Sequence, residues 1–527
     1  MITYQQGKVV INLAGDVMIG RLIDQLLPTS VHNPEEAAIV RQFRLSRSLR
    51  YPYLQEGLYN YATVWGNTIP LWKMGNLNII NLETSATTHD KRWPGKAFNY
   101  RTHPANIACL TVANIHHVSL ANNHSLDFGV RGLEETCESL ERFGISYVGA
   151  GKSREHALGP VFLDVPITFS PIDVKLPPIP INGMAPRSLT SLRIGLLSAS
   201  DHPLDWFSIP LFHLLAHYDL LSVYAQLKPL ITTARLNSDF VIFSIHWGPN
   251  YQWIADQKIQ ELARWMIYQG VDLIHGHSSH HVQGIEIIQR QNGTHGLILY
   301  GCGDFLDDYA IDQLYRNDLS ALFQLHLSIS PLPSQDGRSK SIRLQSLSIF
   351  PTRCSNFQVN RLSLQDVDWT WIKEKLIQLS NSDLSWFQHF NKELSDETVL
   401  AYFYQHFDYA NILLSSIDDL TKTDITDIVV LDTLGQSRIR YMILIGRCGL
   451  IQVLSFTIKE LRELTKLTGL QLVLNDQNII NKLERPRKRL TELMFKIVRI
   501  SLYFLKFIII EQFLIFMILA CLKQFCS

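Results

Sequence analysis

The chain has 527 residues, of which 46% are hydrophobic and 18% charged, and its 48 basic side chains balance 48 acidic ones. This composition excludes an intrinsically disordered chain, which would contain few apolar residues and carry a large net charge. The balance of charge also excludes an overall basic field of the kind that holds nucleic acid, so we expect no nucleic-acid partner.

The first residues of the chain and its cysteines indicate the cellular compartment in which the protein is expected. Residues 1–8 enter a strand-like run directly, without the basic and apolar regions of a signal peptide, so no cleavable export signal is predicted. The seven cysteines form no Cys-x-x-Cys pair, which argues against a zinc ribbon or a thioredoxin-type site. Their irregular spacing favours free thiols in a reducing compartment.

Residues 8–330 alternate between short β-branched runs and helical stretches, which is typical of an α/β domain. The expected strands are residues 9–13, 77–80, 117–120, 240–245, 271–274 and 297–300. Helices are expected at 132–143 and 257–268, because each stretch places its apolar residues on one face. Gly144 and Gly270 follow these stretches as candidate C-caps.

Changes in composition predict the domain boundaries. Several prolines between 166 and 190 forbid a regular element and indicate an exposed excursion. Further strands are expected at about 335–365, which gives a first domain of residues 1–365. Residues 366–490 form a second region, helical at its start, in which no chemical motif indicates a role.

Residues 491–523 are expected to form a membrane-associated helix. The apolar stretch 500–520 is 21 residues long, and about 20 residues span a bilayer. Lys506 and Glu511 interrupt it, each at a cost of up to ~3 kcal/mol, so a buried amphipathic helix is the alternative. Basic residues at 482–489 precede the stretch and would keep the main domain cytoplasmic.

Polar side chains follow the predicted strands, at the point where each strand ends. These residues are Asp16, Glu83, Asn122, Asn123, His124, His246, His277, His280 and Asp304. Ligands of open α/β sheets bind at the carboxyl ends of the strands, so we expect these side chains to meet at one edge. Carboxylate, amide and imidazole donors together suit Mn, Fe or Zn. The sequence therefore predicts a site for one or two divalent metal ions.

Each of these residues taken alone has a more ordinary explanation. An aspartate after a strand, such as Asp16, is often a helix N-cap, and the asparagines at 122–123 are typical of a turn. His246 alone is more often a hydrogen-bonded core histidine. His280 and His281 would point to opposite sides of an extended segment, so at most one of them can face the site. Their joint occurrence at successive strand ends favours the metal hypothesis.

About residues 8–360 resemble the CapA, or PgsA-like, family of poly-γ-glutamate capsule synthesis proteins. The segments that carry the resemblance are 15–21, 81–84, 119–129, 246–248, 276–280, 283–286 and 299–305. That family is similar in fold to the calcineurin-like metallophosphoesterases. The resemblance therefore implies an α/β fold of two packed mixed β-sheets flanked by helices, with a dinuclear metal site.

The resemblance also implies roles for single residues. The positions that match metal ligands are Asp16, Glu83, Asn123, His246 and His277, with His280 as a further candidate. His124 matches the catalytic histidine, and Asp127 would orient it. Apart from the resemblance, Arg21 and Arg101 are available cations for an anionic substrate, which Asn122 and Asp304 are also expected to bind.

Two departures from the pattern concern the metal site. Metallophosphoesterases have a histidine two positions after the first aspartate, where this chain has Met18, so one metal could be lost or bound differently. Ser278 and Ser279 replace the middle pair of the commoner sequence Gly-His-His-Pro-His.

The sequence thus predicts metal-dependent hydrolysis of a phosphoester or related bond, linked by resemblance to capsule or poly-γ-glutamate synthesis. The alternative is a non-enzymatic, membrane-associated accessory that binds an anionic polymer such as poly-γ-glutamate. Family members typically carry an N-terminal anchor with the domain outside the cell. A C-terminal anchor with a cytoplasmic domain conflicts with that arrangement and argues against a capsule role.

Overall fold

The computed structural model describes residues 7–169, 190–215, 220–331, 340–380 and 399–402. All of them belong to the first of two compact units, Met1–Phe403. The expected membrane-associated helix at 491–523, and most of the region 366–490, lie outside the described residues. Among the residues that are described, no helix is both long and apolar enough to cross a bilayer.

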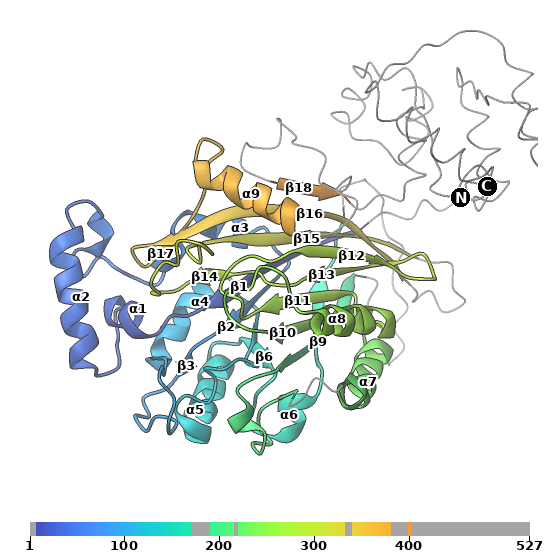
Figure 1. The fold of residues 1–527 in the computed structure, drawn as a ribbon, viewed down its shortest axis with the longest axis horizontal. Helices are drawn as coiled ribbons and strands as arrows, with labels where there is room; N and C mark the ends of the chain where they lie inside the picture. The colour runs from blue at the N-terminus through green and yellow to red at the C-terminus, as the bar shows by residue number, and fades with distance from the viewer. Residues whose placement is uncertain (1–6, 170–189, 216–219, 332–339, 381–398, 403–527) are drawn as a thin grey trace, which may run out of the picture. The chain divides into compact units, whose positions relative to one another are not determined.

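Two mixed β-sheets form the centre of the fold (Figure 1). The first contains β1 (Gly7–Val17), β2 (Leu77–Leu82), β5 (His117–Ser119), β6 (Ser146–Val148), β8 (Thr168–Phe169), β14 (Asp304–Leu306), β15 (Leu319–Pro331), β16 (Lys340–Ser355), β17 (Gln358–Arg361) and β18 (Val399–Tyr402). Its main order is β17-β16-β15-β1-β2-β5-β6, while β14 and β8 pair with β1 and β18 pairs with β16.

The second sheet is formed later in the chain. It contains β7 (Val161–Pro166), β9 (Ser191–Ser200), β10 (Phe240–His246), β11 (Leu273–His277), β12 (Ile285–Gln289) and β13 (His295–Leu299). Their order is β12-β13-β11-β10-β9-β7, with β9, β10, β11 and β13 parallel. A small separate pair consists of β3 (Ser85–Ala86) and β4 (Arg101–Thr102).

The helices flank these sheets. They are α1 (Arg21–Leu26), α2 (Pro34–Arg47), α3 (Ile69–Trp72), α4 (Ala108–Val112), α5 (Gly129–Arg142), α6 (Arg154–Leu158), α7 (Leu220–Asn237), α8 (Gln257–Gln269) and α9 (Val367–Leu379). Short 3₁₀ turns lie at Pro52–Leu54, Thr63–Thr68, Pro104–Ile107 and Leu204–Trp206.

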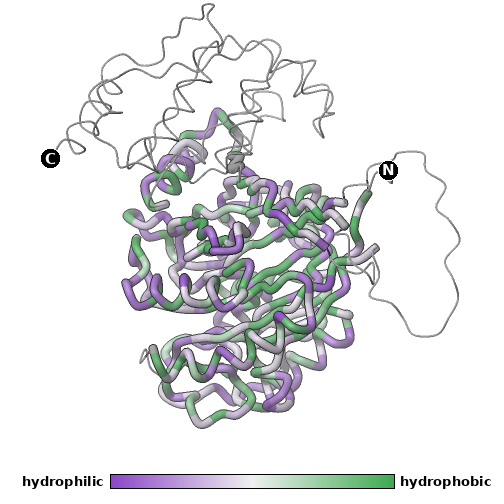
Figure 2. Tube along the Cα trace, turned by 90° about the vertical axis from the view of Figure 1, so that its right-hand side faces the viewer, coloured by the Kyte–Doolittle hydropathy of each residue, from purple (hydrophilic) through white to green (hydrophobic). Residues whose placement is uncertain are grey.

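Three apolar cores hold these layers together. One lies between the sheets and includes Ile11 of β1 and Ile242 of β10. A second packs Leu133 of α5 with residues of the first sheet, and a third packs Leu262 of α8 with residues of the second sheet. Figure 2 shows hydrophobic stretches of the chain running through the middle of the body. The predicted architecture, two packed mixed sheets flanked by helices, is thereby confirmed.

Most predicted elements are present, with shifted ends. The expected strands correspond to β1, β2, β5, β10, β11 and β13, and the helix expected at 257–268 is α8. Gly270 caps α8 in the left-handed region, with φ of 112°. The helix expected at 132–143 begins one turn earlier, at Gly129. The sequence pattern predicts neither β9 nor α7, which the structure adds.

The prediction for residues 166–190 is wrong at its start. Pro166 is the last residue of β7, where it pairs with Ser191 of β9, and β8 then pairs with β1. Proline is tolerated there because β7 is an edge strand, in which the missing N–H removes no central ladder bond. Residues 170–189 lie outside the described part of the chain.

Hydrogen bonds join the two sheets near the strand ends. His275 of β11 donates from Nε2 to the carbonyl of Ala14 in β1 at 2.8 Å, while its Nδ1 accepts from Ser244 at 3.0 Å. The hydroxyls of Ser119 in β5 and Ser198 in β9 are 2.6 Å apart. These buried contacts fix the position of one sheet on the other, because each polar atom would otherwise be left without a partner.

Gly15 allows β1 to approach the segment before β14 closely. An ideal Cβ at this position would lie 1.9 Å from the carbonyl oxygen of Gly303. The neighbouring Asp16 N–H donates to the same oxygen at 3.0 Å. A side chain at residue 15 would therefore push the two backbone segments apart at the point where the polar strand ends begin.

We expect Gly15→Ala to lower the free energy of unfolding by about 3 kcal/mol, because the backbone around a rigid carbonyl has to move. The control is Gly293→Ala, where a Cβ meets open space but φ is 80°, so the cost should be about 1 kcal/mol. Urea unfolding of both variants measures the difference, and equal losses would contradict the close-approach explanation.

Acidification should destabilise the fold through His117. Complete burial, together with the nearby His275, lowers the pKa of His117 to about 3, against ~6.5 in an unfolded chain. The neutral form is therefore favoured in the folded state. Its contribution is complete above pH ~6.5 and is lost as the pH falls, by about 1.4 kcal/mol per pH unit.

In His117→Asn, the loss of unfolding free energy between pH 6.5 and pH 5 should be smaller than in the parent by about 2 kcal/mol. Urea unfolding at a series of pH values in the presence of a chelator measures this difference. Identical pH dependence of the two proteins would show that His117 does not titrate on unfolding.

Candidate metal centre

Strand register brings the predicted polar residues to one place. Asp16 of β1 pairs with Asn81 of β2 on one side and with Asp304 of β14 on the other. In the second sheet, His246 of β10 lies directly opposite His277 of β11. Since the strands in each of these pairs are parallel, their side chains leave the two sheets at the same edge.

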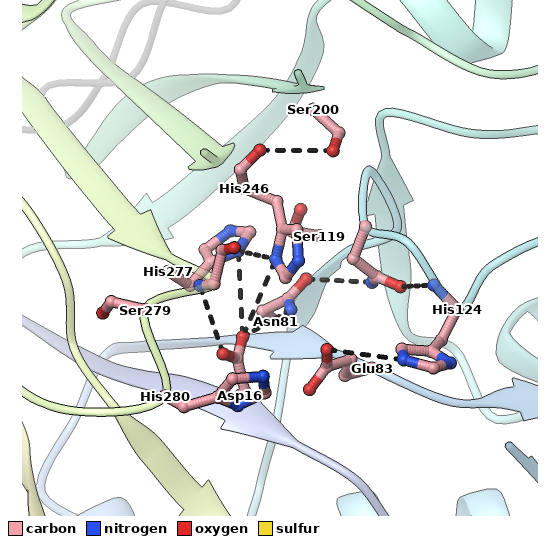
Figure 3. A network of polar contacts seen from close by, with 12 residues as sticks. Asp16, Asn81, Glu83, Ser119, His124, Ser200, His246, His277, Ser279 and His280 are labelled. Atoms are coloured by element: carbon pink, nitrogen blue, oxygen red, sulfur yellow. Dashed lines mark hydrogen bonds and ion pairs between the residues drawn. The ribbon is translucent and has the colours of Figure 1, made fainter. Parts of the chain in front are cut away.

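Two groups of side chains could hold a metal ion, and both contain Asp16. One consists of Asp16, His246 and His277, and the other of Asp16, Glu83, His280 and Asp304. In each group the candidate ligand atoms lie within 4.8 Å of one another, and all residues are buried, although 11% of the His280 side chain is exposed. Figure 3 shows Asp16 between the two histidines and Glu83. A shared carboxylate between neighbouring groups is an arrangement that suits two ions.

The first group has the spacing of a chelate. The Nδ1 atoms of His246 and His277 are 2.9 Å apart, and they lie 4.0 and 3.8 Å from Oδ1 of Asp16. Two metal–nitrogen bonds of ~2.1 Å at a right angle would place their nitrogens about 3 Å apart. The imidazole pair therefore fits a single cation without rearrangement of the strands.

Several buried polar atoms near these groups have no hydrogen-bond partner within the described residues. They include Oε1 of Glu83 and Nε2 of His277, which belong to the groups, and Oδ1 of Asn123, the residue before His124 in the chain. Buried polar atoms are nearly always satisfied, so such a cluster requires an explanation. A divalent cation would satisfy the carboxylate and amide oxygens, and the donor chemistry therefore fits the group that the family resemblance implies.

Burial shifts the pKa values of several carboxylates and imidazoles in these groups. Burial raises the pKa of Glu83 well above its ordinary value, and the nearby carboxylate of Asp16 raises it further. Burial likewise raises the pKa of Asp304. For His246 and His277, burial lowers the pKa well below the ordinary value. The imidazoles are thus neutral, as ligands must be, and a cation would favour the ionised carboxylates.

His124 lies beside the second group in a fixed orientation. Its Nδ1 is 2.7 Å from Oδ2 of Asp127, and its Nε2 is 3.9 Å from Oε1 of Glu83. The ring of Tyr100 stacks on it, with centroids 3.8 Å apart. Burial lowers the pKa of His124 to about 4, although the carboxylate of Asp127 partly opposes this shift. The neutral ring therefore donates to Asp127 from Nδ1, and Nε2 is left on the side of Glu83.

Lys96, in the loop between β3 and β4, helps to hold His124 and Asp127 in this orientation. Its ammonium group contacts Oδ1 of Asp127 and the carbonyl oxygen of Asn123. The Tyr100 N–H donates to the other oxygen of Asp127 at 2.6 Å. Asp127 is consequently held at both oxygens, which fixes the carboxylate that orients His124.

Three of the residues expected to bind substrate have different surroundings. Asp304 lies within the second candidate metal group, with its oxygens 2.9 and 3.1 Å from Nδ1 of His280. Asn122 is buried, and it donates to Oδ1 of Asn81 and to the Leu82 carbonyl. Arg21 lies over the Tyr100 ring, and 29% of its side chain is exposed.

Met18, at the position where metallophosphoesterases have a histidine, belongs to neither candidate group. The second group contains His280 and Asp304 in addition to the two carboxylates of Asp16 and Glu83. The side chain of Met18 is buried, and its sulfur accepts the Gly20 N–H at 3.1 Å. Of the pair at 280–281, only His280 belongs to the candidate ligands. His281 stacks on Tyr315, with ring centroids 4.9 Å apart.

Sequence reasoning missed several residues of the site. Asn81 donates to Oδ1 of Asp16 at 2.6 Å, and its place at a strand end two residues before Glu83 could have revealed it. Tyr309 donates to Oε2 of Glu83 at 3.3 Å. Lys96 and Tyr100 come from a loop between small strands, and no pattern in the sequence marks that loop as part of the site.

Comparison with known proteins finds a family model and several relatives that match this chain. The family model described as bacterial capsule synthesis protein PGA_cap matches residues 10–309, a range that includes every candidate ligand. A probable polyglutamine synthesis accessory protein of Mycobacterium tuberculosis is 30% identical over 375 residues, which are 68% of this chain and 89% of that protein. The capsule biosynthesis protein CapA of Bacillus anthracis is 23% identical over 64% of this chain and 70% of its own length.

A second, shorter similarity is of another kind. A stretch of 95 residues, or 17% of the chain, is 47% identical to mitochondrial NADPH:adrenodoxin oxidoreductase of Rattus norvegicus. It spans 19% of that enzyme. So small a part of an oxidoreductase supports no statement about activity in this chain.

Asp16→Ala should weaken binding at both groups, because this carboxylate is common to them, whereas His246→Ala should affect one group only. We expect the loss to exceed the roughly 10–100-fold seen when an outer-shell partner is removed. Metal analysis after dialysis against Mn²⁺ or Zn²⁺ measures the ions retained per chain. Asp164→Ala, which removes a carboxylate 56% exposed on β7, is the control. Equal metal content in Asp16→Ala and the control would contradict the shared-ligand geometry.

Proposed function

Since the chain belongs to the bacterial capsule synthesis protein family, we propose that it is a metal-dependent hydrolase that cleaves a phosphoester or related bond in an anionic substrate connected with capsule or poly-γ-glutamate synthesis. The observation that carries this proposal is the position of Asp16 in two adjoining candidate metal groups, next to an oriented histidine, His124. A purely structural role would not require so many buried ionisable groups at one edge.

Two sets of residues would hold the ions. Asp16, His246 and His277, with the amide of Asn123, would hold one ion, and Asp16, Glu83, His280 and Asp304 would hold the other. The mixture of oxygen and nitrogen donors favours Mn, Fe or Zn. A bound divalent ion would polarise an oxygen of the scissile bond and lower the pKa of a coordinated water toward ~7.

The chain itself supplies proton transfer. Nε2 of His124 faces the second group, and Asp127 fixes the opposite nitrogen. Negative charge on a substrate at this nitrogen would raise the pKa of the imidazole and favour the protonated form. His124 can then give its Nε2 proton to the departing oxygen, while Asp127 and Lys96 keep the ring in place.

Arg21 is a cation available for an anionic substrate. Its guanidinium is partly exposed above Tyr100, the ring that stacks on His124. The ion pair with Asp308, at 3.4 Å, and the hydrogen bond with Tyr100 occupy only some of the five N–H donors of the guanidinium, so others can bind further oxygens. Lys96 is less suited to this role, because its ammonium group already contacts Asp127.

The second candidate function is that of a non-enzymatic, membrane-associated accessory that binds an anionic polymer such as poly-γ-glutamate. The name of the Mycobacterium tuberculosis relative, an accessory protein for polyglutamine synthesis, favours it. In such a protein the metal ions would help to hold carboxylates of the polymer, and no bond would be broken. The two functions differ in their dependence on His124.

His124→Asn should reduce kcat about 10²–10⁴-fold on a generic phosphodiester such as bis(p-nitrophenyl) phosphate, because the leaving oxygen would lose its proton donor. The metal content should stay that of the parent protein. His156→Asn, a change of an exposed histidine on α6, is the control and should be silent.

If the metal-loaded protein has no turnover, or if His124→Asn turns over as fast as the parent, the hydrolase proposal fails. Binding of poly-γ-glutamate by the parent and by His124→Asn with equal affinity would then support the accessory function.

A further inference from the structure

A third strand of the second sheet ends beside the first candidate metal group. Ser200, the last residue of β9, pairs with His246 of β10, which in turn pairs with His277 of β11. The chain continues into Asp201 and His202, and the Asp201 N–H donates to the carbonyl of His246 at 3.1 Å. The residues after β9 are therefore held at the level of the candidate ligands.

His202 lies next to His246 in the same way that His246 lies next to His277. The ring centroids are 5.0 Å apart in the first pair and 5.1 Å in the second. The side chain of His202 is 30% exposed, whereas those of His246 and His277 are 1% and 0% exposed. His202 is thus the solvent-exposed member of these three neighbouring imidazoles.

Asp201 fixes the orientation of this exposed imidazole. Its Oδ1 accepts from Nδ1 of His202, and its Oδ2 accepts the Gly248 N–H at 2.8 Å. The hydroxyl of Ser200 donates to the His202 carbonyl at 2.7 Å. With Nδ1 engaged by a carboxylate, the lone pair of the neutral ring is on Nε2. Histidine ligands of metals almost always have a carboxylate or carbonyl in this position.

We propose that His202 is a further protein ligand, through Nε2, of the ion held by Asp16, His246 and His277, and that Asp201 is its positioning residue. This inference rests on the proposed metal site and extends it to β9, on the solvent side of the first group. An ordinary exposed aspartate–histidine pair would contribute little to stability and would not need an anchor at both oxygens of Asp201.

The test is a titration of the metal-free full chain with Mn²⁺, followed by calorimetry, and the visible absorption spectrum of the Co²⁺ form. His202→Ala should weaken the binding of one ion by more than the roughly 10–100-fold typical of an outer-shell change, and it should change the Co²⁺ spectrum, because the ion loses a ligand. Asp201→Asn should cause a smaller loss of affinity, about 10–100-fold, because it removes only the partner that orients His202. His156→Ala, a change of the exposed histidine on α6, should leave both readouts unchanged.

His202→Gln serves as a second variant in case the alanine variant does not fold, and it should show the same loss of affinity. If the parent binds Mn²⁺ but the variants at 202 keep the parent affinity and Co²⁺ spectrum, the inference about His202 is wrong and the metal site remains. If the parent binds neither Mn²⁺ nor Co²⁺, this inference and the proposed function both fail.

Discussion

The site depends on one electrostatic constraint, the burial of several ionisable groups around Asp16. Four carboxylates and imidazoles in the second group, and three in the first, are brought together where little water can solvate them. Desolvation works against the charged forms of all of them. Such a collection is costly unless a positive charge offsets the carboxylates, and a cation bound where the two sheets meet would supply that charge.

Register, rather than any single loop, produces this concentration of ligands. Asp16 lies between Asn81 and Asp304 because β1 pairs with β2 and β14, and His246 lies against His277 because β10 pairs with β11. Glycines at the crowded positions allow the backbones to approach closely, as Gly15 does beside Gly303. A shift of one residue in any of these pairings would turn a ligand to the opposite face of its sheet.

The sequence predicted much of the fold because its central strands are short, apolar and followed directly by polar residues. The same feature located Asp16, Glu83, His246 and His277, which the structure brings together. The sequence pattern could not assign Asp304 to the second group, because the position of Asp304 beside Asp16 depends on the pairing of β14 with β1. Lys96 was missed because it reaches His124 from a loop, and His202 because it follows β9, whose polar flanks gave no strand signal.

The candidate ligands are divided between the two sheets, Asp16 and Asp304 in the first and His246 and His277 in the second. An ion bound by both halves would act as a cross-link between layers that are otherwise joined by an apolar core and a few hydrogen bonds. By mass action, the folded state would then be favoured as free metal rises above the dissociation constant. Metal supply in the cell would then contribute to the stability of the protein as well as to any activity at the site.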